Sequence, residues 1–73
     1  MSIVALVQKV ADTLTPSERS LVKEVIARPR EIALVTAGEL AGRAGVHEAT
    51  ASRLARKLGF GSYADFRDAI REE

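Results

Sequence analysis

The residues best suited to binding chemistry gather in one stretch, AGVHEATASRLARKLGF, which covers residues 44–60. On a helix that turns about 100° per residue, this stretch separates into two faces. The polar face carries Glu48, Ala49, Ser52, Arg53 and Arg56. The apolar face carries Ala51, Leu54, Ala55 and Leu58. Arginine can bond guanine through two hydrogen bonds in the major groove of B-form DNA, and alanine can touch a thymine methyl group, so the polar face predicts a DNA-reading helix.

Charge is uneven along the chain, although the 73 residues carry a net charge of only +1. Residues 40–58 hold four basic side chains against the single acid Glu48, a local charge of +3. Residues 65–73 hold four acids against two arginines, a local charge of −2. A nearly neutral chain with one basic patch fits a partner that is anionic in one place. A solvated helix face with chance clustering is the alternative that charge alone leaves open.

The elements that must position this face are helices, because no alternating run of β-branched residues predicts a strand. Ser2 can cap a first helix. The apolar stripe of that helix is Ile3, Leu6, Val7, Val10 and Leu14. Pro16 suits the first position of a second helix, where Thr15 and Glu18 form a capping box and Pro29 marks the end. The buried face expected for the second helix is Leu21, Val22, Val25 and Ile26.

A helix-turn-helix unit is expected at about residues 36–58. The segment PREIALV predicts a short helical turn, and a capping box between Thr36 and Glu39 begins a third helix. Gly45 suits the left-handed conformation that ends a helix, and about three residues separate this helix from the fourth, at 48–58. Two helices joined by so short a turn, with glycine at the bend, are typical of a helix-turn-helix.

The end of the chain completes an all-α prediction. Gly59 is expected to stop the fourth helix and Ser62 to cap a fifth. The residues of the fifth helix expected to face inward are Tyr63, Phe66 and Ile70. No strand pair follows Leu58, so no wing of the winged-helix type is expected. The predicted fold is a single domain over residues 1–73, a compact bundle of about five short helices.

Several classes of protein are excluded by what the chain lacks. It has no cysteine, which rules out disulfides and thiolate metal sites and agrees with a reducing compartment, so we expect the cytoplasm. One histidine makes no metal site, and neither a phosphate-binding glycine loop nor an activated nucleophile is present, so we expect no enzyme, cofactor or metal. No apolar run approaches the ~20 residues of a membrane span, so no membrane partner is expected.

Three segments in order, LTPSER, ELAGRAGVHEATASRLARKLGF and YADFR, resemble the N-terminal helix-turn-helix domain of RpiR-type bacterial transcriptional regulators. The resemblance covers about residues 14–70. It implies an operator-binding domain, normally followed by a sugar-isomerase-type domain that senses a phosphorylated sugar. This chain holds no such second domain, so we expect a fragment of a longer regulator or an atypical short protein. The family usually has serine at the position of His47, and histidine is a poorer helix cap.

For such a domain, we expect the fourth helix to enter the major groove of double-stranded DNA. The expected base-edge contacts are Glu48, Ala49, Ser52 and Arg53. The expected phosphate or flanking contacts are Thr36, Arg43, His47, Thr50, Arg56, Lys57 and Ser62. The functional protein is expected to be a homodimer or larger on a palindromic operator, since such readers bind two half-sites about one helical turn apart. A sugar phosphate would act only through the second domain.

The sequence alone leaves other functions open. In the rival hypothesis the chain is a small helical protein-interaction module whose basic face docks an acidic protein. Ala49 and Ser52 favour DNA over that rival, because small side chains let a helix approach a groove closely. A structured-RNA binder is disfavoured, because the A-form major groove is too narrow for a helix. The first helix, with Val4 and Ala11 widening its apolar surface, fits either a place within the bundle or a dimer contact.

Overall fold

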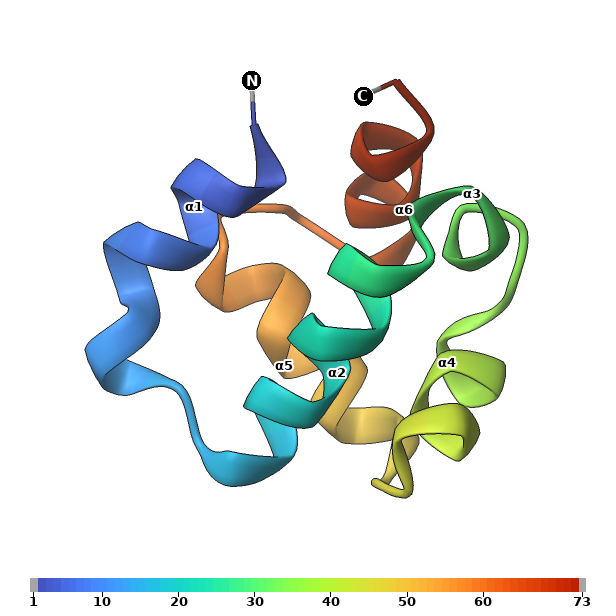
Figure 1. Ribbon diagram of the computed structural model, residues 1–73, viewed down its shortest axis with the longest axis horizontal. Coiled ribbons are helices and arrows are strands. Elements are labelled where there is room, and N and C mark those ends of the chain that lie inside the picture. The colour runs from blue at the N-terminus through green and yellow to red at the C-terminus, as the bar shows by residue number, and fades with distance from the viewer. Residues whose placement is uncertain (1, 73) are drawn as a thin grey trace.

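Residues 2–72, the part of the chain that the computed structural model describes, fold into seven helical segments (Figure 1). These are α1 (Ile3–Val10), the 3-10 helix η1 (Ala11–Thr13), α2 (Pro16–Ala27), α3 (Pro29–Ile32), α4 (Ala37–Ala44), α5 (Glu48–Lys57) and α6 (Tyr63–Glu72). No strand occurs among residues 2–72, and the all-α prediction is confirmed.

Side-chain caps fix where the helices begin. At α2 and α4 the predicted capping boxes are both complete: the threonine hydroxyl accepts a backbone N–H, and the glutamate of the first turn accepts the N–H of the threonine. The Ser2 hydroxyl accepts from the N–H of Ala5, and the Ser62 hydroxyl accepts from the N–H of Asp65. Each such cap is worth roughly 0.5–2 kcal/mol, which matters in a domain whose helices are this short.

The predicted helical turn after Pro29 is present as α3. Two details differ from the sequence prediction: the end of the first helix and the exposure of Ile26. The first helix tightens into η1 after Val10 instead of running on to Leu14. Ile26 was expected in the buried face of α2, but its side chain is 51% exposed. Leu21 and Val25 already direct that face toward the core, and Ile26 lies about 100° further round the helix from Val25.

Every α-helix contributes at least one buried apolar residue to the core, and α5 and α6 contribute three each. The largest fully buried side chains are Leu21, Ile32, Leu40, Leu54 and Phe66. Burying each of them contributes roughly 1.5–3 kcal/mol relative to leaving it in water. Tyr63 packs its ring edge against Phe66, with the ring centroids 5.9 Å apart, which confirms that these aromatic residues serve the core.

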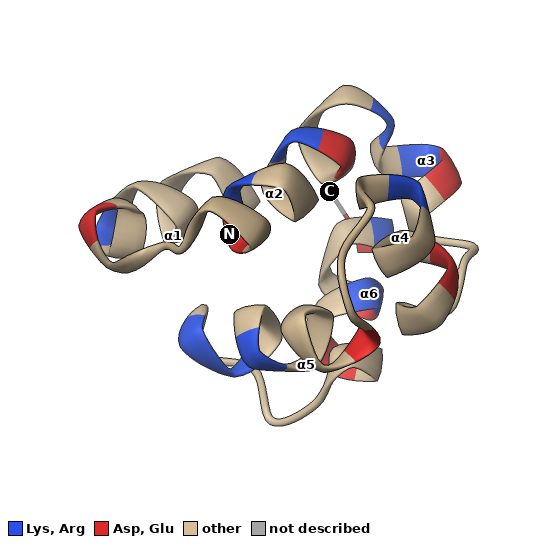
Figure 2. Ribbon diagram, turned by 90° about the horizontal axis from the view of Figure 1, so that it is seen from below, with Lys and Arg blue, Asp and Glu red and all other residues tan. Residues whose placement is uncertain are grey.

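The arrangement leaves α5 at one side of the molecule. α2 packs against α3, α4 and α5, and α6 packs against α3 and α5. In Figure 2, α1 and α2 lie along one edge and α5 along the opposite edge, with the basic segments of α5 toward one of its ends. The fold thus holds α5 from behind through α2, α4 and α6, and leaves its other side to solvent.

Candidate nucleic-acid interface

The two faces predicted for α5 are present in the structure. The side chains of Ala51, Leu54, Ala55 and Leu58 are buried. On the other side, Glu48, Ala49, Arg53 and Arg56 are exposed and Ser52 is half-buried. The apolar residues are therefore occupied by packing, and a surface of two arginines between small residues remains available to a partner.

The turn before α5 is closed by a glycine in the left-handed conformation. Gly45 has φ 72°, and its N–H donates to the carbonyl oxygen of Gly42 at 3.3 Å. The N–H of Val46 donates to the carbonyl oxygen of Ala41 at 2.9 Å. These two bonds form a Schellman motif, which satisfies the last carbonyls of α4 and reverses the chain within two residues. Ala41 and Ala51 are buried, so α4 and α5 meet through small side chains.

The start of α5 lacks a side-chain cap. His47 occupies the cap position with φ −75° and ψ 148°, but its imidazole makes no capping hydrogen bond. Its carbonyl oxygen accepts from the N–H of Thr50 at 3.0 Å. The imidazole is exposed beside the first turn of α5, where it is free to meet a nucleic-acid backbone.

The carboxylate of Glu48 lies beside the first turn of α4. Its Oε2 is 3.5 Å from the point that a Cβ on Gly38 would occupy. The glycine thus leaves room for the acid at the junction of the two helices. A carboxylate in the first turn of a helix is favoured by the helix dipole, and at a base edge it can accept from the amino group of cytosine.

Thr50 does not stand where the sequence suggested. It was expected to flank the polar face and meet a phosphate, but its residue is only 3% exposed. Its hydroxyl oxygen accepts a hydrogen bond from Nη2 of Arg53 at 3.1 Å. Burial denies Thr50 the exposure that the predicted phosphate contact would need, and its hydroxyl supports Arg53 instead.

Two basic residues of the predicted site are engaged inside the domain. Nη1 of Arg43 lies 2.8 Å from Oε2 of Glu31, which joins α4 to α3. Nζ of Lys57 lies 2.7 Å from Oε1 of Glu18 and 2.8 Å from the carbonyl oxygen of Thr13. The Arg43 pair is exposed to solvent, whereas the Glu18 side chain is 3% exposed. Exposed pairs such as Arg43–Glu31 contribute little and exchange readily with other anions.

The hydroxyls of Thr36 and Ser62 act as caps and are exposed. Each accepts a backbone N–H, from Glu39 at 3.1 Å and from Asp65 at 3.2 Å. A hydroxyl has one hydrogen to donate as well as lone pairs to accept, so each can still donate to a phosphate oxygen. These residues lie at the starts of α4 and α6, where the helix dipole also favours an anion.

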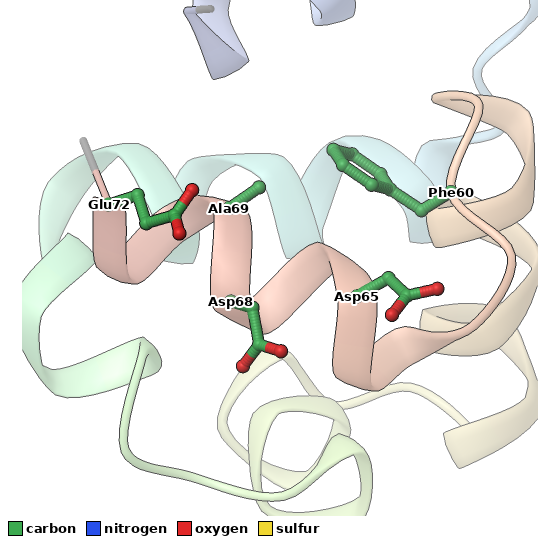
Figure 3. Close-up of a pocket in the computed structure, with 5 residues that line it drawn as sticks. All are labelled: Phe60, Asp65, Asp68, Ala69 and Glu72. Carbon is green, nitrogen blue, oxygen red and sulfur yellow. The ribbon is translucent and has the colours of Figure 1, made fainter.

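Not every surface suits a nucleic acid. A pocket of about 390 Å³ on α6 is lined by Phe60, Asp65, Asp68, Ala69 and Glu72, and Figure 3 shows its three carboxylates spaced out along the helix. Phosphates would be repelled here, so this side of α6 is expected to point away from DNA. No group of three or more potential metal ligands occurs among residues 2–72, and no helix there could cross a membrane.

Glu18 is the residue that sequence reasoning missed. It was recognised only as the partner of Thr15 in a capping box, yet it also binds Lys57. A signal was present, because Glu18, Leu21 and Val25 follow one another at helical spacing and therefore share the buried face. A carboxylate on such a face requires a cation, although the sequence does not say which one.

The Schellman turn, the close packing of α4 on α5 and the exposed basic face of α5 define a helix-turn-helix domain of the DNA-binding class. The whole chain, residues 1–73, matches the family described as the helix-turn-helix domain, rpiR family. The protein belongs to that family. The resemblance found in the sequence is thereby confirmed, and with it the assignment as a DNA-binding domain of a transcriptional regulator.

One solved structure adds an independent comparison. It is the N-terminal domain of ybbH from Bacillus subtilis subsp. subtilis str. 168, a protein assigned as a transcriptional regulator. The two chains are 28% identical, the match covers 92% of this chain and 82% of that one, and the TM-score is 0.83. No curated protein gives a significant match.

Proposed function

We propose that this domain reads double-stranded DNA by inserting α5 into the major groove, with Glu48, Ala49, Ser52 and Arg53 at the base edges. The observation that carries the proposal is the division of α5 into a fully packed face and an exposed face with two arginines. Arginine is the side chain best suited to guanine, and Ala49 and Ser52 are small enough to allow close approach. The proposed role is binding, with no catalytic step.

The remaining polar residues of the site have different parts in this proposal. Thr36, Ser62, His47 and Arg56 are exposed and would meet the sugar–phosphate backbone, which sets the register of the helix in the groove. Arg43 would join them by exchanging Glu31 for a phosphate. Thr50 supports Arg53 from inside and makes no direct contact.

The assembly proposed for the functional protein is a dimer on a palindromic operator. Helix-turn-helix readers usually bind two half-sites about one helical turn of DNA apart. A second, sugar-phosphate-sensing domain of a longer regulator would then control the dimer, in the cytoplasm where bacterial DNA lies. A domain tested alone should bind weakly, through phosphates more than bases.

The first test is an amide NMR titration of the domain with a short random-sequence duplex, repeated at low and moderate salt. We expect shifts confined to α4, α5 and the residues around Ser62, fading as salt rises because counterions compete for the phosphates. The amides of α1 and of the acidic side of α6 serve as internal controls and should stay in place.

A docking function for the same face is the rival outcome. If an acidic protein moves the α5 amides while duplex DNA leaves them unchanged at low salt, the DNA-reading proposal fails. If both DNA and an acidic protein move the α5 amides, raising the salt distinguishes the two functions. A helix that reads the groove keeps some α5 shifts at moderate salt with a preferred DNA sequence and loses them with a random one.

A further inference from the structure

A partly buried ion pair ties the last residue of α5 to α2. Lys57 is the last residue of α5, and its ammonium is held between Oε1 of Glu18 at 2.7 Å and the carbonyl oxygen of Thr13 at 2.8 Å. The same Glu18 oxygen accepts from the N–H of Thr15 at 2.8 Å. The Lys57 ammonium and the Glu18 carboxylate together therefore join the end of η1, the start of α2 and the end of α5.

The two partners differ in their access to solvent. The Glu18 side chain is 3% exposed, whereas that of Lys57 is 29% exposed. Glu18 is thus unable to touch a macromolecule outside the domain, while Lys57 lies one helical turn beyond Arg53, at the edge of the proposed DNA-reading face. Glu18 can therefore act on DNA binding through Lys57 or through the capping box of α2, and of these two only Lys57 lies beside the proposed DNA-reading face.

Breaking the Glu18–Lys57 pair should strengthen sequence-independent binding to DNA. A buried carboxylate without its cation is strongly unfavourable, so Lys57 stays bound while Glu18 is charged. A lysine released from its carboxylate becomes a flexible cation that can neutralise a phosphate of any sequence. Sequence-independent binding would then gain a contact that carries no base information.

We propose that Glu18 is a specificity-determining residue: by holding the Lys57 ammonium against the Thr13 carbonyl, it fixes the end of α5 and withholds one cation from the DNA backbone. The inference rests on the proposed DNA-reading function. In this proposal, a buried residue of α2 controls the ratio of the affinity for a specific DNA sequence to the affinity for a random one. Lys57 is, on this basis, a positioning residue and makes no phosphate contact.

The central variant is Glu18→Gln, because glutamine keeps an oxygen for the N–H of Thr15 and preserves the capping box while removing the charge that holds Lys57. Glu39→Gln is the matched control. Glu39 has the same capping role in α4, accepting from the N–H of Thr36 at 3.3 Å, but it takes part in none of the ion pairs of residues 2–72. Both variants raise the net charge by the same amount.

The measurement is binding to two duplexes as a function of salt: one of random sequence, and one selected from a random pool by the unaltered domain. For Glu18→Gln on the random duplex, we expect the slope of log K against log salt to steepen by about 0.9, one extra phosphate contact. A fourfold rise in salt would then weaken that variant about 3.5-fold more than the unaltered domain. The ratio of selected to random binding should fall, and Glu39→Gln should change neither slope nor ratio in this way.

A second substitution shows whether the extra contact is Lys57. In the double variant Glu18→Gln with Lys57→Met, the slope should return to that of the unaltered domain. A steep slope that persists in the double variant, or a single variant whose slope and ratio match those of Glu39→Gln, overturns the inference. If the unaltered domain binds neither duplex at low salt, the DNA-reading function itself has failed instead.

A readout on the unaltered domain makes the test independent of how well the variants fold. The ammonium resonance of Lys57 can be followed by NMR during titration with the random duplex. We expect it to keep its free-state shift while the Arg53 and Arg56 resonances move. A Lys57 ammonium that shifts together with those arginines would show a phosphate contact and would overturn the proposal.

Discussion

Nη2 of Arg53 donates a hydrogen bond to the hydroxyl oxygen of Thr50, 3.1 Å away and one turn earlier in α5. Thr50 is buried and β-branched, so its own side chain is held in place. Arg53 is thereby partly ordered before it meets a partner. Ordering a long side chain on binding costs roughly 0.5–1.5 kcal/mol, and this bond removes part of that cost in advance.

Replacing Arg53 by alanine should weaken binding to a selected duplex by about 1–3 kcal/mol and relax the preference at one base pair. The reason is the loss of the proposed bidentate contact between Arg53 and a guanine edge. The measurement is a set of duplexes, each changed at one position, titrated with both proteins. Arg56→Ala is the control and should weaken all duplexes about equally, as expected for a phosphate contact. An unchanged base preference in Arg53→Ala would remove Arg53 from the reading residues.

Alanine substitutions at two glycines, one inside α4 and one at its end, should change the stability of the domain in opposite directions. Gly45 has φ 72°, a conformation that costs a residue with a Cβ roughly 1–2 kcal/mol, so Gly45→Ala should destabilise the domain by about that amount. Gly42 lies inside α4, and apart from its own helix no atom stands within 4 Å of the point that a Cβ would occupy. Gly42→Ala should therefore stabilise the domain by roughly 0.5–1 kcal/mol. Urea unfolding of both variants measures the difference, and equal signs would contradict this account of the turn.

His47→Ser should stabilise the domain by roughly 0.5–1 kcal/mol. His47 holds the cap position of α5 without a side-chain bond, and a serine hydroxyl there can accept an N–H of the first turn. For a domain of this size, 1 kcal/mol corresponds to about 4–8 °C in Tm. Thermal unfolding checks the gain, and His47→Ala is the control that should show none of it. Weaker duplex binding despite the gain would assign the imidazole a direct contact.

Acid should destabilise the domain through Glu18. Burial by itself would raise the pKa of the Glu18 carboxyl, but hydrogen bonds from Lys57 and Thr15 and the charge of Lys57 lower that pKa below its ordinary value. A carboxyl whose pKa is lower in the folded state stabilises above its unfolded pKa, and that stability is lost as pH falls through the folded pKa. Urea unfolding from about pH 6 downward should therefore show stability decreasing below about pH 4.5.

Lys57→Met is the control for the pH experiment. Without the lysine, burial is opposed only by the hydrogen bonds with Thr15, so the pKa of Glu18 should rise and the loss of stability on acidification should become smaller. Glu31, whose pKa is also lowered by its hydrogen bond from Arg43, is present in both proteins, and its contribution cancels in the comparison. Parallel pH profiles for the two proteins would show that the Glu18–Lys57 pair does not control acid sensitivity.

The parts of the fold that the sequence predicted are those with local causes. The capping hydrogen bonds of Thr15, Thr36 and Ser62 span three residues, and the hydrogen bonds around the left-handed Gly45 span at most five. Each of these features can therefore be predicted from a short segment of sequence. The buried and exposed faces of α5 followed from helical periodicity alone. The starts of these helices and the exposed side of α5 were accordingly predicted correctly.

The parts that were missed depend on partners far away in the chain. Lys57 meets a carboxylate 39 residues earlier and Arg43 meets one 12 residues earlier, and no local pattern pairs them. Thr50 is polar by type, and only the tertiary packing around α5 shows that it is buried. The sequence thus suggested which side chains could touch DNA, which stays a prediction, but it did not show which of them already have partners inside the domain.

The length of α5 limits how much a single domain can distinguish. With 10 residues between two turns, the helix is about 15 Å long, comparable to roughly four base pairs along the duplex axis. A four-letter word in a four-letter alphabet recurs by chance about once in 256 positions, whereas a chromosome offers on the order of 10⁶ competing sites or more. In the proposed mode of binding, a single domain would therefore match thousands of sites, and selecting one site would require a second domain bound at a fixed spacing.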